Sequence, residues 1–283
     1  MCRDQGAYDA GLRFLVRSRP CPAQPKSDLG GKRLFGDASR LLDLWPSFSK
    51  SPIVTHFDWS PLITAALGTN ADAIHPSLSS LTPSSFSPYS KPTPLSGLLA
   101  LHIRRGDFIE HCLNLANWTS SYTAYNEFPG LLDRFSPPPF QSGGQVPEER
   151  ARYRAHCFPD TEQIVSRVRE VRASLLSTTR LTRVYVMTNG RPEWLQELKD
   201  ALQADAEREH LDRWEQITTS RDLDLSREQR HNGQAIDMAI GQRAEVFLGN
   251  GVRSHIYIYS CDGSEAYRSS VWFFINLVLE SDV

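Results

Sequence analysis

Two hydrophobic periods alternate along the chain after residue 95, and each change of period marks a change from strand to helix. Short apolar runs predict buried strands at residues 98–104, 183–188, 214–218 and 245–248. Apolar residues on one helical face predict helices that begin at Asp160 or Thr161 and that span 191–206 and 234–243. The alternation predicts an α/β domain, a mostly parallel sheet with helices on both faces.

A boundary near residue 95 is predicted from composition. Residues 76–97 repeat Ser and Pro, which favours an extended linker. We therefore expect a region 1–95, followed by the strand-and-helix domain at 96–283. Residues 111–158 interrupt the pattern after its first strand and read as a long insertion that contains several aromatic residues.

Composition excludes several classes of protein. The 283 residues are 40% hydrophobic and carry a net charge of −2, so we expect a large core and no nucleic-acid partner. The sequence contains no run of 18 apolar residues, about the length that spans a bilayer, and its first residues lack the apolar core of a signal peptide. No phosphate-binding loop of the G-x-x-x-x-G-K-[ST] type and no G-x-G-x-x-G turn is present.

The cysteines show no metal-ligand spacing, and one pair brackets the insertion. Of the five cysteines, Cys112 and Cys157 can either form a disulfide in an oxidising compartment or remain two buried thiols. The tripeptide at 117–119, Asn-Trp-Thr, is a glycosylation sequon that makes Asn117 a candidate acceptor.

The strand at 98–104 runs into a cluster of polar residues, His102, Arg104, Arg105 and Asp107. In open α/β sheets, ligands bind in the crevice at the carboxyl ends of the strands. An arginine placed there can grip a phosphate with a planar pair of donors. The alternative interpretation is a surface Arg–Asp ion pair at a strand end.

The pattern His-x-Arg-Arg-x-Asp at 102–107 resembles the first motif of the GDP-fucose-dependent fucosyltransferases, which include the protein O-fucosyltransferases. Residues 184–189 resemble the second strand and turn of that family. Asp237 and residues 244–254 resemble its third motif. The resemblance covers roughly residues 98–254, with the motifs in the family's order.

The resemblance implies a GT-B-like fold, with a Rossmann-like nucleotide-sugar domain after a partial acceptor-side region. It implies an inverting, metal-independent transfer of fucose from GDP-fucose to a hydroxyl of a protein or glycan. It also implies a location in the endoplasmic reticulum or Golgi. Because no signal peptide or membrane anchor is visible, we expect a truncated chain or an incomplete gene model.

The first motif carries the roles closest to the chemistry. By resemblance, Arg104 is the diphosphate-binding and catalytic arginine, and Arg105 is a second, more variable one. His102 is expected to shape the nucleotide site. Asp107 is expected to orient the arginines by pairing with them.

The other motifs supply further substrate-binding candidates. Asp237 matches a carboxylate suited to accept hydrogen bonds from guanine N1 and N2. Ser254 matches the second serine of a pair that holds phosphate oxygens. Thr188 and Asn189 follow a strand and are expected to face the same crevice.

Departures from the family pattern leave competing hypotheses. Arg253 stands where the family has the first serine, and Asn189 replaces its usual aspartate. Few residues precede the first motif, and no general base can be assigned. Candidates for the base by residue type alone are Glu110, Glu127 and Asp160. The alternatives are an inactive domain that binds GDP-sugars or glycans, and a truncated, non-functional fragment.

Overall fold

A computed structural model describes residues 46–48, 50–80, 94–119, 135, 146–175, 179–249 and 257–258. The helices are α2 (Pro52–Thr55), α3 (Pro61–Thr69), α4 (Ala71–Ile74), the 3-10 helix η1 (Pro76–Ser80), α5 (Phe108–Asn117), α6 (Pro147–Cys157), α7 (Thr161–Leu175), α8 (Pro192–Arg208), α9 (Arg227–His231) and α10 (Gly233–Gly241). The strands are β1 (Leu95–His102), β2 (Arg183–Met187), β3 (Gln216–Thr219), β4 (Ala244–Gly249) and β5 (Tyr257–Ile258).

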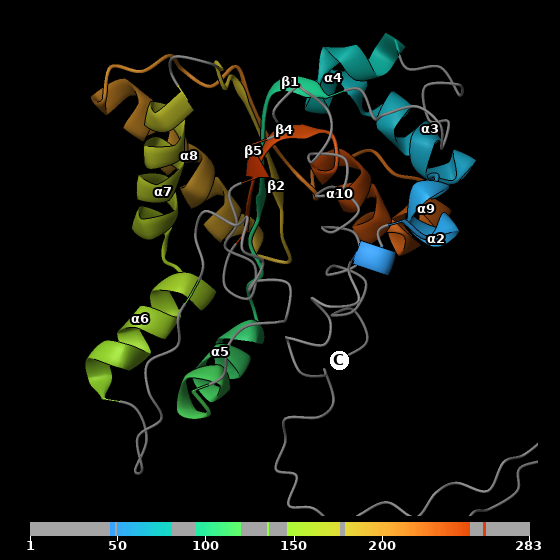
Figure 1. Cartoon of the computed structure of the whole chain (residues 1–283). Coiled ribbons are helices and arrows are strands. Elements are labelled where there is room, and N and C mark those ends of the chain that lie inside the picture. Colours follow the sequence, from blue (N-terminus) through green and yellow to red (C-terminus); the bar gives the residue numbers. More distant parts are fainter. Residues whose placement is uncertain are drawn as a thin grey trace, which may run out of the picture. The chain divides into compact units, whose positions relative to one another are not determined.

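The strands form one sheet in the order β3-β2-β1-β4-β5 (Figure 1). The first four strands are parallel, and β5 pairs with β4 in the antiparallel sense. The predicted α/β architecture and its mostly parallel sheet are therefore confirmed. The strand predicted at 98–104 begins earlier, at Leu95, and ends at His102.

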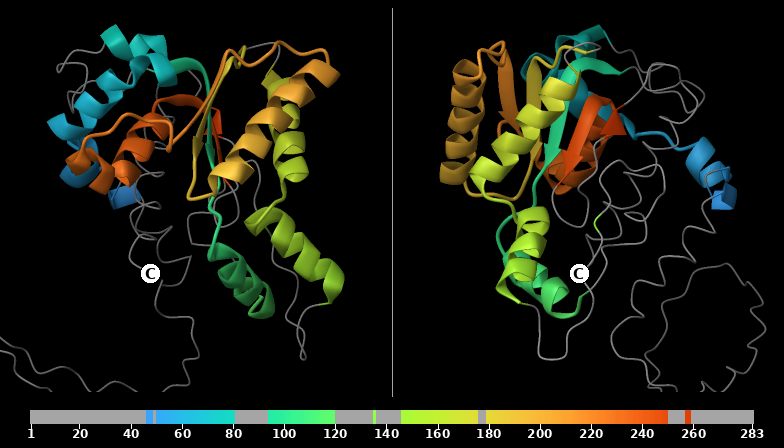
Figure 2. Two further views of the ribbon diagram at one scale, coloured as in Figure 1. Left: turned by 180° about the vertical axis from the view of Figure 1, so that it is seen from behind. Right: turned by 60° about the vertical axis from the view of Figure 1, so that its left-hand side comes forward.

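Helices cover both faces of this sheet (Figure 2). On one face, α7 and α8 pack on alternate strand residues such as Leu99 and Leu101. On the other, α3, α4 and α10 pack on Leu98, Ala100 and Tyr185. The helices before β1 thus share a core with the strands after it. Because β1 is buried on both sides, its residues 97–101 are apolar or glycine without alternation.

The connections change direction on the sheet between β1 and β4. The chain passes from β1 to β2 and then β3, and it returns through α9 and α10 to β4 on the other side of β1. Such a switch leaves a crevice at the carboxyl ends of the two strands, the usual ligand position in open α/β sheets.

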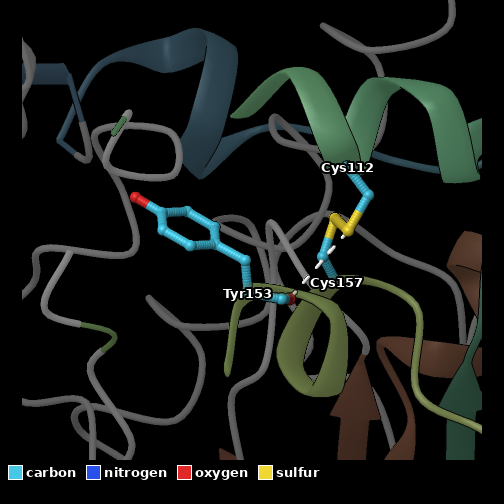
Figure 3. The surroundings of a disulfide bond; sticks show 3 residues. All are labelled: Cys112, Tyr153 and Cys157. Carbon is cyan, nitrogen blue, oxygen red and sulfur yellow. Dashed lines mark hydrogen bonds between the residues drawn. A yellow bond between two sulfur atoms is a disulfide. The ribbon is translucent and has the colours of Figure 1, made fainter. Parts of the chain in front are cut away.

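The segment predicted as an insertion contains two helices that pack together. Helices α5 and α6 lie beyond the carboxyl ends of the strands (Figure 1), and they enclose a small core of their own. A disulfide joins Cys112 on α5 to Cys157 on α6, with 5.8 Å between their Cα atoms (Figure 3). The structure thus favours the disulfide over two separate thiols. The fully buried Tyr153 lies one turn before Cys157.

We expect the double variant Cys112→Ser, Cys157→Ser to lose about 2–5 kcal/mol of unfolding free energy. The bond spans 45 residues, and its removal gives the unfolded chain more conformations. Urea unfolding followed by circular dichroism measures the loss. A reductant should lower the stability of the wild type by a similar amount and leave that of the double variant unchanged. Equal urea midpoints of the wild type and the double variant without reductant would contradict the prediction.

Candidate functional site

The end of β1 lies at the centre of the sheet's carboxyl edge. His102 is in register with Met187 of β2 on one side and with Gly249 of β4 on the other. One residue later, the Ile103 N–H donates to the Met187 carbonyl at 2.9 Å. The backbone that carries the two arginines therefore leaves the sheet next to the switch between β1 and β4.

The two arginines lie in different surroundings. Arg104 is half-buried, and its guanidinium lies 5.3 Å from the ring centre of Phe108. Arg105 is only 8% exposed, and its guanidinium lies 4.6 Å from the ring centre of Phe158 and 4.1 Å from that of Trp194. Both rings present a favourable face to a cation. Arg105 is therefore held inside the protein, and Arg104 is the more accessible of the pair.

Burial lowers the pKa of Arg105 to about 10, against the opposing effect of the negative charges of Asp160 and Glu197. The side chain remains protonated at neutral pH. Its buried Nε donates no hydrogen bond to any described residue. Its cation is therefore balanced by ring faces and by carboxylates nearby, rather than by a direct ion pair of its Nε.

Asn189 joins the turn after β2 to the turn after β1. Its Oδ1 accepts the backbone N–H of Arg105 at 2.6 Å, and its Nδ2 donates to the Arg105 carbonyl at 3.2 Å. Thr188, just before it, uses its Oγ1 to accept the N–H of Gly190 at 3.0 Å. The structure thus brings both predicted residues to the same edge, where they act on the backbone.

Arg221 continues this network to the turn after β3. Its Nε donates to the Gly190 carbonyl at 2.9 Å, and its Nη2 donates to the Asn189 carbonyl at 3.4 Å. The ends of β1, β2 and β3 are therefore linked side by side. Arg221, Phe158 and Trp194 were not predicted from the sequence. The available signal for Arg221 was its position three residues after the strand predicted at 214–218.

Trp194 packs closely over the turn after β2. A Cβ on Gly190 would lie 2.5 Å from the ring atom Cε3 of Trp194. The indole Nε1 donates to Thr161 Oγ1 at 3.2 Å, at the start of α7. Gly190 is therefore required so that the indole ring can reach Arg105.

Asp237 on α10 is engaged by two hydroxyl groups. Its carboxylate accepts the Tyr185 hydroxyl at 2.6 Å and the Ser220 hydroxyl at 2.9 Å, which links α10 to β2 and to the end of β3. Burial raises the pKa of Asp237 to about 7, although both hydrogen bonds oppose the rise. The predicted contact with guanine stays a prediction.

The remaining predicted residues lie apart from this network. Asp107 is exposed at the start of α5, and in the described part of the chain no hydrogen bond or ion pair joins its carboxylate to Arg104 or Arg105. Asn117 is exposed at the last turn of α5. Ser254 lies outside the described residues.

A pocket of about 420 Å³ opens beside the ends of β1 and β4, on the face covered by α7. Ile103, Leu248 and Gly249 contribute to its floor. Its polar lining includes Gln163 and Arg167, and Arg167 pairs with Glu170 at 2.7 Å. An apolar floor with a few polar groups, in this volume range, is typical of small-ligand sites.

Within the described residues, no group of three potential metal ligands is found, and none of the helices is long and apolar enough to cross a membrane. No protein-family model matches the chain, and a search of curated proteins finds no match. The likeness to the fucosyltransferases therefore rests on the sequence motifs alone.

Replacing Gly190 by Ala is expected to lower the free energy of unfolding by about 1–3 kcal/mol, because the new methyl group overlaps the Trp194 ring. Gly233→Ala is a matched control, since apart from its chain neighbours and the backbone of its own helix no described atom lies within 4 Å of the added Cβ. Chemical denaturation of both variants measures the difference. Equal stability of the two would show that the indole ring is not confined by this turn.

Asp237→Asn is expected to remove part of the pH dependence of stability. The raised pKa means that the folded carboxyl holds its proton up to about pH 7, whereas the unfolded one loses it near pH 4. The wild type should therefore lose stability as the pH rises from about 4 to about 7, by at most about 4 kcal/mol. Denaturation of the wild type and of Asp237→Asn at several pH values gives the slope of unfolding free energy against pH for each protein. Identical slopes for the two proteins would contradict the prediction.

Proposed function

We propose that the chain transfers fucose from GDP-fucose to a hydroxyl group of a protein or glycan, with inversion and without a metal ion. The observation that carries this proposal is the place of Arg104. It follows the central strand at the switch between β1 and β4, and it is the partly exposed arginine of the His-x-Arg-Arg-x-Asp pattern.

The proposed reaction forms a bond between the acceptor oxygen and the sugar's anomeric carbon, and it breaks the bond from that carbon to the diphosphate. Negative charge grows on the departing diphosphate, and a fixed cation stabilises it most in a site that excludes water. Arg104 supplies that cation. The acceptor proton goes to a base that we leave unassigned; Asp160 instead caps α7 by accepting the Gln163 N–H at 2.8 Å.

Other features support a nucleotide-sugar site at this edge. His102 lies between the ends of β2 and β4, and its neighbours Leu101 and Ile103 line a pocket on the face that α7 covers. In the proposal, Asp237 contacts the guanine and Ser254 the phosphates. Asn189 and Thr188 shape the edge through the backbone contacts described above.

The proposal includes a GT-B arrangement, in which part of the region 1–95 belongs to the acceptor side, whereas α3 and α4 of that region pack on the sheet. A location in the endoplasmic reticulum or Golgi follows from the same resemblance. The disulfide between α5 and α6 supports an oxidising compartment, because such bonds persist there and are rare in the cytosol. The exposed position of Asn117 supports its glycosylation.

A second candidate function is binding of GDP-sugars without turnover. The burial of Arg105 between two rings favours it, because the second arginine of the motif is then not available to a leaving diphosphate. A turnover assay with GDP-fucose and an acceptor panel separates the two functions: GDP binding without release of GDP from the donor would indicate the binding protein.

We expect Arg104→Ala to weaken GDP binding at least about tenfold and to abolish turnover, because a charge-assisted hydrogen bond to phosphate contributes about 1.5–3 kcal/mol. Calorimetric titration with GDP and then GDP-fucose measures the change. Arg180→Ala is the control; this arginine is exposed and pairs with Asp212. Equal affinities of wild type and Arg104→Ala would refute the site.

A further inference from the structure

We propose that Asn189 is a positioning residue, whose carboxamide fixes the backbone at Arg105 and thereby the direction in which Arg104 points. This inference rests on the proposed function, because it concerns the arginine that would hold the diphosphate. It assigns to Asn189 a role through the protein backbone rather than a contact with substrate.

The two hydrogen bonds extend the sheet beyond its last residue. The ladder between β1 and β2 ends with Ile103 N–H bonded to the Met187 carbonyl. Two residues later, the carboxamide of Asn189 takes the place of a strand: it binds both the N–H and the carbonyl of Arg105. The N–H belongs to the peptide plane between Arg104 and Arg105, so its orientation sets ψ of Arg104.

Asn189 is itself held from the far side. Arg221 donates to the carbonyls of Asn189 and Gly190, so the turn after β2 is anchored on the turn after β3. Gly106, at φ +68°, begins the turn into α5, and a Cβ there would lie 3.5 Å from Nδ2 of Asn189. The carboxamide therefore lies between two turns that the sheet keeps in place.

The Arg105 side chain is also held in place. Its guanidinium lies between the rings of Phe158 and Trp194, and its backbone is bound by Asn189. Both ends of this residue are fixed. Its role is then that of an anchor for the adjacent Arg104, which is partly exposed and lies against the Phe108 ring.

The site requires an amide and not a carboxylate. Asn189 accepts from an N–H and donates to a carbonyl, and an ionised aspartate has no donor. In Asn189→Asp, a carboxylate oxygen would face the Arg105 carbonyl oxygen at the present 3.2 Å separation. A protonated aspartic acid can again donate one hydrogen bond there, so the effect of this substitution should depend on pH.

Titration of the full chain with GDP between pH 4.5 and 8 tests the inference, with every affinity compared to that of the wild type at the same pH. At pH 7.5, Asn189→Asp and Asn189→Ala are both expected to bind at least about tenfold more weakly. As the pH falls, Asn189→Asp should recover most of this loss, whereas Asn189→Ala should not. Circular dichroism at each pH restricts the comparison to folded protein.

Asn232→Asp is the matched control for the change of charge, since Asn232 is exposed and its Nδ2 donates to the Glu228 carbonyl on α9. It should bind GDP as the wild type does. Wild-type affinity of Asn189→Asp at every pH would overturn the inference, as would a loss that follows Asn189→Ala without recovery. A wild-type chain that binds no GDP would overturn the proposed function and this inference together.

Discussion

Burial of β1 is the constraint on which the rest of the structure depends. Strands on either side take its backbone hydrogen bonds, and helices on both faces take its side chains. A strand enclosed in this way cannot carry unpaired charge along its length, because a buried charge without a partner is costly. Polar chemistry is therefore confined to the carboxyl end, where His102 is the last residue of the strand and the arginines follow the buried Ile103.

At that end, the adjacent residues Arg104 and Arg105 lie in different surroundings. Both arginines follow the end of β1, where the chain has left the sheet. Arg105 meets aromatic rings from α8 and from the segment after α6, whereas Arg104 lies over Phe108 and keeps contact with solvent. Arg105 is thus held in the interior, whereas Arg104 is partly exposed.

Much of the architecture could be predicted from the spacing of apolar residues along the chain. Helices α7, α8 and α10 each bury one face, and the central strands bury both of their faces. The ends of elements were less predictable: β1 begins before the expected strand since Leu95 and Gly97 are buried as well. The placing of Arg105 depends on Phe158 and Trp194, and that of Asp237 depends on Tyr185 and Ser220. Those partners are distant in sequence, so no local pattern could reveal them.

The disulfide between α5 and α6 determines where the chain can change in length at little cost in stability. It closes the chain between Cys112 and Cys157 into a loop next to the strand ends. Since the entropy of a closed loop changes only slowly with its length, residues could be gained or lost inside it at little cost in stability. Phe158 follows the second cysteine and packs on Arg105. Phe158 lies outside the closed loop, so changes in the length of that loop would leave its contact with Arg105 in place.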